Sequence, residues 1–272
     1  MTQVSSTFAA TGAESYELMM GRWGRRLAGP FLDFSDLMDD GKILDAGCGT
    51  GALTAELLQR TTVAEVTGVD IAEAYVAYAR QAVKSPRVNF EVGDLTALNY
   101  PDCAFDQVFS QLVLLFVPDF EQAIRELNRV TKPGGRISAT TWDIIGGFVF
   151  NRIFWDVAAM LDPEAEKLRQ RAFSRPLTRP NELAQAWLNA GMKEVRSGEI
   201  TIRTEFLSFD DFWKPLAEGD GPIPAYVQQT DDTLRSKIEG ALRRAYLGGD
   251  NDGPRSYVGT AWVVSGLKPV EA

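Results

Sequence analysis

Acidic and glycine residues cluster between positions 43 and 54 in the order that a nucleotide-binding turn requires. Ile43-Leu44 belongs to a short apolar run typical of a buried strand, which ends on Asp45. Three glycines then alternate with other residues: Gly47, Gly49 and Gly51. Glycine lets a ligand approach bare backbone, and the helix that follows offers unpaired N–H groups to an anionic group. The pattern predicts a cofactor site between a strand and a helix of a doubly wound α/β fold.

The glycine spacing alone leaves the cofactor class open. Residues 47–52 fit both G-x-G-x-G and the dinucleotide form G-x-G-x-x-A, and a packing turn without a ligand is a third interpretation. Asp45, two positions before the first glycine, decides among them, because Asp-x-Gly-x-Gly-x-Gly resembles the first motif of class I methyltransferases that use S-adenosylmethionine (SAM). The resemblance implies that Asp45 orders the loop beside the amino-acid end of SAM. It also implies that Gly47 and Gly49 let that end pack on backbone.

A second acid ends the next predicted strand, which covers residues 65–70. Asp70 lies at the distance from the glycines where a carboxylate accepts hydrogen bonds from ribose hydroxyls, in dinucleotide and SAM sites alike. The alternative is that Asp70 only caps the helix beginning at Ala72. The family resemblance implies ribose binding by Asp70, with Ile71 packed on the adenine.

Two further strands carry predicted cofactor contacts at their ends. The resemblance implies that the side chain of Asp94 reaches the adenine N6, and that the backbone N–H of Leu95 meets the ring. A dehydrogenase has no general need of this acid, so Asp94 discriminates between the two cofactor classes. Residues 104–111 resemble the family's Phe-Asp-x-Val strand, and Gln111 is predicted to contact the methionine moiety.

The segment ahead of the first strand, residues 14–34, has the apolar spacing of one or two amphipathic helices, with Gly29-Pro30 as a possible break. The run from Tyr16 to Trp23 resembles the N-terminal segment of many small-molecule methyltransferases, in which a helix folds over bound SAM. The resemblance implies that Tyr16 and Arg22 meet the methionine part, with Arg22 pairing with its carboxylate. A core tyrosine and a surface arginine are the alternative.

The order of these elements predicts the fold class: a doubly wound, Rossmann-like α/β fold with a seven-stranded sheet whose last strand is antiparallel, and helical insertions that form a lid. We expect one methyltransferase domain over residues 1–272. Its expected parts are a core of 36–142, 181–206 and 255–268, an N-terminal helical cap of 12–35, and lid insertions of 143–180 and 207–254. The Gly-Pro-rich stretch 219–224 is expected to be a loop that moves over the site.

Composition limits the chemistry and the partners. None of the 272 residues is a histidine, which removes the commonest general base and the usual zinc and iron ligands. We therefore predict no metal site and assign no catalytic residue. Tyr16, Tyr226 or a carboxylate would have to act if a base is needed. A net charge of −9 disfavours nucleic acid as a partner. Residues 1–11 lack the pattern of a signal peptide, and no stretch approaches the ~20 apolar residues of a membrane span, so we expect a cytoplasmic protein without a membrane partner.

Together, the ordered motifs over residues 14–142 resemble the small-molecule branch of the class I methyltransferases. The resemblance implies SAM as cofactor, S-adenosylhomocysteine (SAH) as product, and in-line SN2 transfer to a small, partly apolar acceptor, with catalysis mainly by positioning. Two alternatives remain open: an NAD(P)-dependent oxidoreductase, and a non-catalytic SAM-binding or regulatory protein. No motif in the second half names the acceptor, its accepting atom or an oligomeric state.

Overall fold

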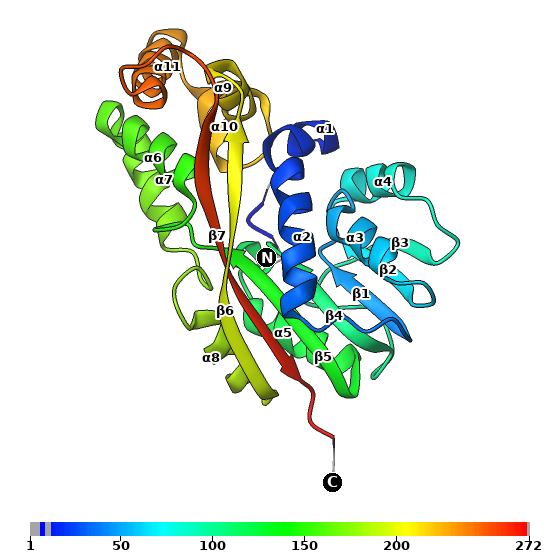
Figure 1. Cartoon of the computed structure of the whole chain (residues 1–272). Coiled ribbons are helices and arrows are strands. Elements are labelled where there is room, and N and C mark those ends of the chain that lie inside the picture. The colour runs from blue at the N-terminus through cyan, green and yellow to red at the C-terminus, as the bar shows by residue number, and fades with distance from the viewer. Residues whose placement is uncertain (1–5, 9–11, 271–272) are drawn as a thin grey trace.

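A single mixed sheet organises the chain (Figure 1). The computed structural model describes residues 6–8 and 12–270, and within them the seven strands are ordered β3-β2-β1-β4-β5-β7-β6. The pairs β3-β2, β2-β1, β1-β4 and β4-β5 are parallel, and β7 runs antiparallel to both β5 and β6. The predicted fold class is confirmed, including the antiparallel last strand.

The elements alternate along the chain as a doubly wound fold requires. The strands are β1 (Lys42–Ala46), β2 (Glu65–Asp70), β3 (Val88–Val92), β4 (Phe105–Gln111), β5 (Thr131–Trp142), β6 (Lys193–Phe206) and β7 (Arg255–Leu267). The helices are α1 (Ala13–Tyr16), α2 (Arg22–Phe34), α3 (Ala52–Arg60), α4 (Glu73–Ala82), α5 (Phe120–Val130), α6 (Val149–Leu161), α7 (Pro163–Phe173), α8 (Glu182–Asn189), α9 (Phe209–Glu218), α10 (Pro222–Gln229) and α11 (Asp232–Leu247). A π-helical turn, η1 (Glu17–Gly21), joins α1 to α2, and a 3-10 turn, η2 (Leu114–Phe116), follows β4. None of the described helices combines the length and the apolar content that a bilayer crossing needs.

Helices cover both faces of the sheet because neighbouring strand residues point in opposite directions. On one face, Ile43 of β1 packs with Leu27 of α2 and Leu57 of α3. On the other face, Leu44 packs with Leu127 of α5. This arrangement buries β1 on both sides and fixes the position where its carboxyl end opens into a loop.

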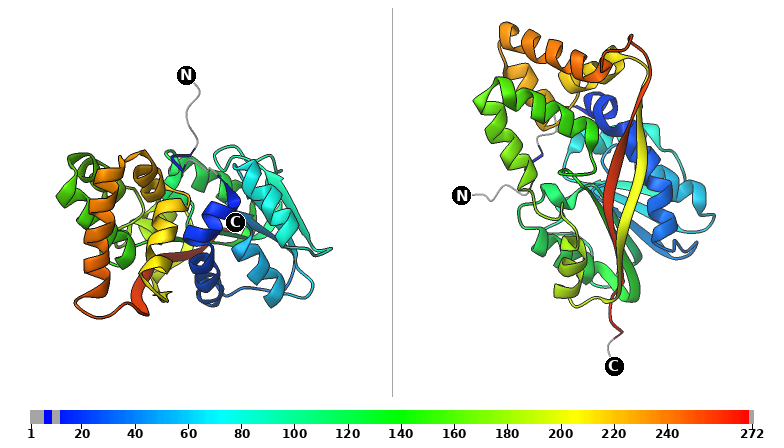
Figure 2. Two further views of the ribbon diagram at one scale, coloured as in Figure 1. Left: turned by 90° about the horizontal axis from the view of Figure 1, so that it is seen from above. Right: turned by 60° about the vertical axis from the view of Figure 1, so that its left-hand side comes forward.

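The far ends of β6 and β7 carry a second group of helices (Figures 1 and 2). We call α6, α7, α9, α10 and α11 the insertion cluster; it is built from the two segments predicted as insertions. Phe154 and Trp155 of α6 contact Tyr226 of α10, with ring centroids 6.2 Å and 6.0 Å apart. The two insertions therefore share one aromatic core although β6 separates them in sequence.

Two local predictions are wrong. The helix does not break at Gly29-Pro30, since α2 continues through both residues to Phe34. A proline inside a helix costs ~3 kcal/mol. Leu27, Ala28 and Phe31 around it are fully buried, and this packing outweighs the lost hydrogen bond.

The stretch 219–224 is also not a long loop. The helix α10 begins at Pro222, because proline at the first helical position has a suitable φ and needs no N–H partner. Asp220, ahead of that helix, is only 3% exposed. The segment is therefore packed into the molecule.

Candidate functional site

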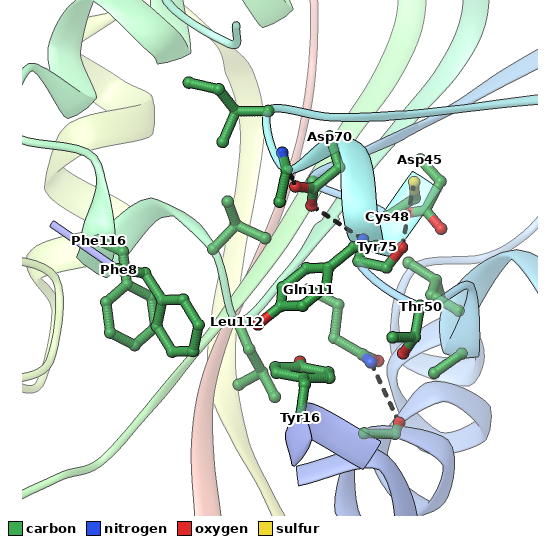
Figure 3. Close-up of a pocket in the computed structure, with 18 of the residues that line it drawn as sticks. Phe8, Tyr16, Asp45, Cys48, Thr50, Asp70, Tyr75, Gln111, Leu112 and Phe116 are labelled. Carbon is green, nitrogen blue, oxygen red and sulfur yellow. Dashed lines mark hydrogen bonds between the residues drawn. The ribbon is translucent and has the colours of Figure 1, made fainter. Parts of the chain in front are cut away.

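The carboxyl ends of β1, β2 and β4 open into one pocket beneath the N-terminal helices. Strand order reverses between β1 and β4, which is the switch point where ligands bind in open α/β sheets. The pocket holds about 990 Å³ of atom-free space, with the space at its mouth included. Nine of the ten predicted site residues line it: Tyr16, Asp45, Gly47, Gly49, Asp70, Ile71, Asp94, Leu95 and Gln111. Figure 3 shows Asp45 and Asp70 at one end, and Phe8 and Phe116 at the other.

The glycine turn adopts a backbone conformation that other residues rarely reach. Gly47, Gly49 and Gly51 have φ values of 82°, 53° and 91°. A Cβ atom on Gly47 would overlap the side chain of Val113, whereas one on Gly49 would meet nothing within 4 Å. Gly47 is therefore required by packing, and Gly49 leaves backbone bare toward the pocket.

Asp45 is a buried carboxylate that the protein satisfies only in part. It is 1% exposed, and its Oδ2 accepts a hydrogen bond of 2.5 Å from the hydroxyl of Thr54. Its Oδ1 is buried and has no hydrogen-bond partner in the part of the chain that the structure describes. Burial raises the pKa of Asp45 to about 7; the bond from Thr54 opposes this shift and the charge of Asp70 adds to it.

Gln111 supplies a second unsatisfied acceptor. Its Nε2 donates to the backbone carbonyl of Gly24 at 3.1 Å, and its Oε1 is buried with no partner among the described residues. Buried polar atoms are nearly always hydrogen-bonded in folded proteins. Two such acceptors lining one pocket, Asp45 Oδ1 and Gln111 Oε1, therefore indicate a place for a ligand that carries N–H donors or a positive charge.

Asp70 holds the loop in place and also lines the pocket. Its Oδ2 accepts from the N–H of Gly49 and its Oδ1 from the N–H of Ala72, both at 2.9 Å. These bonds fix the turn before α4, which begins at Glu73 without a side-chain cap bond, and each oxygen of Asp70 keeps a lone pair for a ligand. Burial raises the pKa of Asp70.

Asp94 lines the same pocket beyond the next strand. Its Oδ1 accepts from both the N–H and the hydroxyl of Thr96 at 2.8 Å, which fixes the orientation of the carboxylate. The neighbouring side chains are apolar. Leu95 is buried, and Ile71 is 45% exposed beside the pocket. The pocket therefore places an acid next to apolar surface at this end, as a purine ring requires.

Arg22 is the predicted residue that does not reach the pocket. Its Nη1 lies 3.1 Å from Asp211 Oδ1, and its guanidinium lies over the rings of Trp23 and Phe206 at 4.3 Å and 4.8 Å. The π-helical turn η1 separates Tyr16 from Arg22, and of the two residues only Tyr16 lines the pocket. Gly21 and Gly24 line the pocket in its place.

Sequence analysis missed a hydroxyl–carboxylate pair beside the pocket. The hydroxyl of Tyr75, on the first turn of α4, donates to Asp220 Oδ2 at 2.6 Å. The ring of Tyr75 lies 5.0 Å from that of Tyr16. Tyr75 was detectable, because the helix after Asp70 begins against the pocket. Asp220 carried no signal, since it comes from a remote insertion.

Neither tyrosine considered as a base is prepared for that role. Burial, and then the charge of Asp70, raises the pKa of Tyr16 well above its usual range. Tyr226 donates to Asp162 Oδ2 at 2.7 Å, and burial with that bond raises its pKa too. Both side chains stay protonated at neutral pH and act as hydrogen-bond donors.

The comparisons with known proteins agree with this geometry. Residues 44–139 match the model of a methyltransferase domain family. The chain is 34% identical over 119 residues to the methyltransferase GfsG of Streptomyces halstedii, covering 42% of each chain. It is 42% identical over 104 residues to a malonyl-[acyl-carrier protein] O-methyltransferase of Halorhodospira halophila, covering 37% of this chain and 35% of the relative. The alignments thus span less than half the length of these curated relatives.

A solved structure extends the fold likeness over almost the whole chain. A phosphoethanolamine N-methyltransferase of Haemonchus contortus, in complex with phosphomonomethylethanolamine and SAH, matches with a TM-score of 0.60 at 17% identity. The match covers 96% of this chain and 57% of that protein. The family-model match over residues 44–139, with methyltransferases as relatives and as a structural neighbour, supports a methyltransferase domain of the class I, SAM-dependent family and confirms the resemblance seen in the sequence. This family uses SAM as its methyl donor.

Proposed function

We propose that this protein binds SAM in the pocket at the ends of β1, β2 and β4 and transfers its methyl group to a small molecule. One observation carries the proposal: the buried acceptors Asp45 Oδ1 and Gln111 Oε1 have no hydrogen-bond partner among the described residues, and both residues line the pocket together with Asp94. An amino-acid ammonium group needs such acceptors, and an adenine amine needs such an acid.

Each side chain then has a chemical task. Asp45 and Gln111 would hold the ammonium group of the methionine part, over the bare backbone of Gly49. Asp70 would accept hydrogen bonds from the ribose, since both its oxygens keep unused lone pairs. Asp94 would accept from the adenine amine, with Leu95 and Ile71 against the ring.

When bound, SAM supplies an electrophilic methyl group that needs no further activation. The tasks left to this chain are to align the acceptor atom with the S–CH₃ bond and to exclude water. Phe8 and Phe116, whose ring centroids are 5.0 Å apart, form part of the pocket wall at the end opposite Asp45 and Asp70 and shield that end from water. Catalysis by positioning fits a chain without histidine and with protonated tyrosines. An NAD(P)-dependent oxidoreductase gains no support, because the named relatives are methyltransferases.

Turnover tests the proposal directly. The purified protein is incubated with SAM and a panel of phenols, carboxylic acids, amines and thiols, and SAH is quantified by mass spectrometry. We expect SAH to form with at least one acceptor class and not with the Asp70→Ala variant. SAM binding without SAH from any class would instead favour the non-catalytic alternative.

The raised pKa of Asp45 predicts a pH dependence. An ammonium group prefers the ionised carboxylate, so SAM affinity is expected to increase as the pH rises through about 7, and the Asp45→Asn variant should lose this increase.

The stability of the ligand-free protein should change with pH in the opposite sense. Since the folded pKa exceeds the ordinary 3.8, the free energy of unfolding should fall between pH 3.8 and about 7. Calorimetric titration and urea unfolding at several pH values measure both effects. A SAM affinity that falls toward higher pH in wild type but not in Asp45→Asn would contradict the assignment.

The position of Arg22 gives a negative prediction. Arg22→Met is expected to leave SAM affinity within about twofold of wild type, because the side chain lies outside the pocket. The same variant should lower the free energy of unfolding by about 1 kcal/mol, because it loses a partly exposed ion pair and two contacts with aromatic rings. A tenfold or greater loss of affinity would show that Arg22 swings to the methionine carboxylate when ligand binds.

A further inference from the structure

A second cavity adjoins the cofactor pocket and has walls of a different character. It holds about 700 Å³ of atom-free space, with the space at its mouth included. The two spaces share five lining residues: Phe8, Tyr16, Met20, Leu112 and Phe116. On its other side the cavity is closed by the end of β5 and by the insertion cluster, through Trp142, Trp155 and Ile223 among others. A molecule in this second cavity would thus lie directly beside a cofactor in the first.

The walls of this acceptor cavity, as we call it, favour a flat apolar ligand. Trp142 and Phe148 stack with ring centroids 4.4 Å apart and an interplanar angle of 7°. Phe150 does not line the cavity but supports Phe148 from behind, edge to face at 4.6 Å, and the lining residue Trp155 is almost completely buried. Parallel and edge-on aromatic faces of this kind contact planar rings well.

Two buried polar atoms in this aromatic lining have no hydrogen-bond partner within residues 6–8 and 12–270. Trp142 is 4% exposed, and its Nε1 is one of them. The indoles of Trp187 and Trp262, by contrast, donate to backbone carbonyls at 3.0 Å and 2.9 Å. Asn151 of α6 also lines the cavity, and its Oδ1 is likewise buried without a partner. A ligand that satisfies both groups needs a hydrogen-bond-accepting oxygen for the indole and a hydroxyl or amine for the carboxamide.

Arg175 adds a positive charge to the same cavity. It forms no ion pair within the described part of the chain, whereas Arg169 and Arg179 on either side are paired with glutamates. Its guanidinium lies 4.5 Å from the centroid of the Phe116 ring, and one nitrogen donates to the hydroxyl of Thr7 at 3.0 Å. Burial lowers its pKa, which indicates a charge poorly compensated by water or protein. A carboxylate is, with phosphate, a group that a guanidinium binds through paired hydrogen bonds.

We propose that the acceptor cavity binds an aromatic hydroxy acid as the methyl acceptor. The ring lies among the aromatic walls, and the carboxylate pairs with Arg175. The hydroxyl group accepts a hydrogen bond from Trp142 Nε1 and donates one to Asn151 Oδ1. The carboxylate of Asp220 also lines this cavity and already accepts from Tyr75, so an acidic group is directed away from it and toward Arg175. This inference rests on the proposed function, since it names the substrate class for the same site.

Separate titrations of the cofactor and the acceptor test the inference. The probes are 3-hydroxy-2-naphthoate and its uncharged counterpart 2-naphthol, each titrated calorimetrically into the full-length protein saturated with SAH; SAH itself is titrated first. We expect naphthoate to bind at least about tenfold more tightly than naphthol. Arg175→Met should remove that difference while changing naphthol affinity less than about twofold, and Arg175→Lys should restore part of it.

Matched variants separate recognition from structure. Trp142→Phe removes the indole N–H and Asn151→Leu removes the carboxamide, each leaving an apolar side chain, and each should weaken naphthoate about three- to tenfold without changing SAH affinity. Trp262→Phe and Arg179→Met are the controls. They remove an indole N–H and a guanidinium that are already bonded within the protein and lie outside the cavity, so neither change should alter the affinity for the probes. Equal affinity of the wild type for naphthoate and naphthol, or no binding of either at millimolar concentration, would contradict an aromatic hydroxy acid as the acceptor. If SAH still binds, the proposed function stands in that case. Failure of SAH to bind would instead remove the proposed function, and this inference with it.

Discussion

Replacing Asp70 with alanine is expected to weaken SAM binding by about 3 kcal/mol, roughly 150-fold. Two losses add in this variant. The ribose hydroxyls lose their acceptor, and the N–H groups of Gly49 and Ala72, which both donate to Asp70 at 2.9 Å, lose the bonds that shape the loop. Asp94→Ala removes a side chain that orders only Thr96, so its expected effect is smaller, about 1–2 kcal/mol.

A surface variant controls for the change in charge. Asp40 is exposed, and Asp40→Ala removes one negative charge without touching the pocket. Its SAM affinity should equal that of wild type in calorimetric titration, and circular dichroism should show all three variants folded. Unchanged affinity in both Asp70→Ala and Asp94→Ala would contradict the assignment of the site.

Gly47→Ala is expected to be the most damaging single-methyl change in the turn. The residue has a φ of 82°, and a Cβ atom there would overlap the side chain of Val113. Strained backbone costs about 1–2 kcal/mol, and overpacking adds about 1–3 kcal/mol. We therefore expect the free energy of unfolding to fall by about 3 kcal/mol, measured by urea denaturation, with SAM binding impaired in the fraction that folds.

A second glycine separates strain from overlap. Gly249 has a φ of 91° and a Cβ there would meet nothing within 4 Å. Gly249→Ala should therefore cost only about 1 kcal/mol. Adding Val113→Ala to Gly47→Ala should recover part of the loss, because the second change removes the atoms that the new methyl group meets. Equal destabilisation by both glycine variants would show that the contact with Val113 is unimportant.

The predictable part of this protein is the part that sequence-local rules control. Asp45 and Asp70 follow two buried strands that pair in parallel, and the carboxyl ends of parallel neighbours meet at the same edge of a sheet. The sequence pattern therefore predicts that both carboxylates lie at one pocket. The antiparallel last strand follows from the family resemblance and not from any residue. Its position between β5 and β6 pairs it with residues at least 49 positions away in the sequence, since Phe206 pairs with Arg255.

Tertiary packing decided the features that the sequence did not predict. Pro30 is a helix breaker by propensity, yet burial of its neighbours carries α2 through it. Arg22 belongs to a recognisable segment, but Asp211 and the ring of Phe206, both distant in sequence, hold it elsewhere. The partner of Tyr75 is Asp220, 145 positions away. Contacts of this kind depend on how the insertions fold, and a single sequence shows no periodicity for them.

Calorimetric titration of the purified protein with SAM, SAH and NAD in parallel tests the central claim most directly. We expect SAM and SAH to bind with micromolar or lower Kd, and NAD to give no heat of binding. The buried acceptors Asp45 Oδ1 and Gln111 Oε1, which have no partner among the described residues, match an ammonium group that NAD lacks. Binding of NAD without binding of either adenosyl ligand would contradict the claim and assign the glycine turn to a dinucleotide.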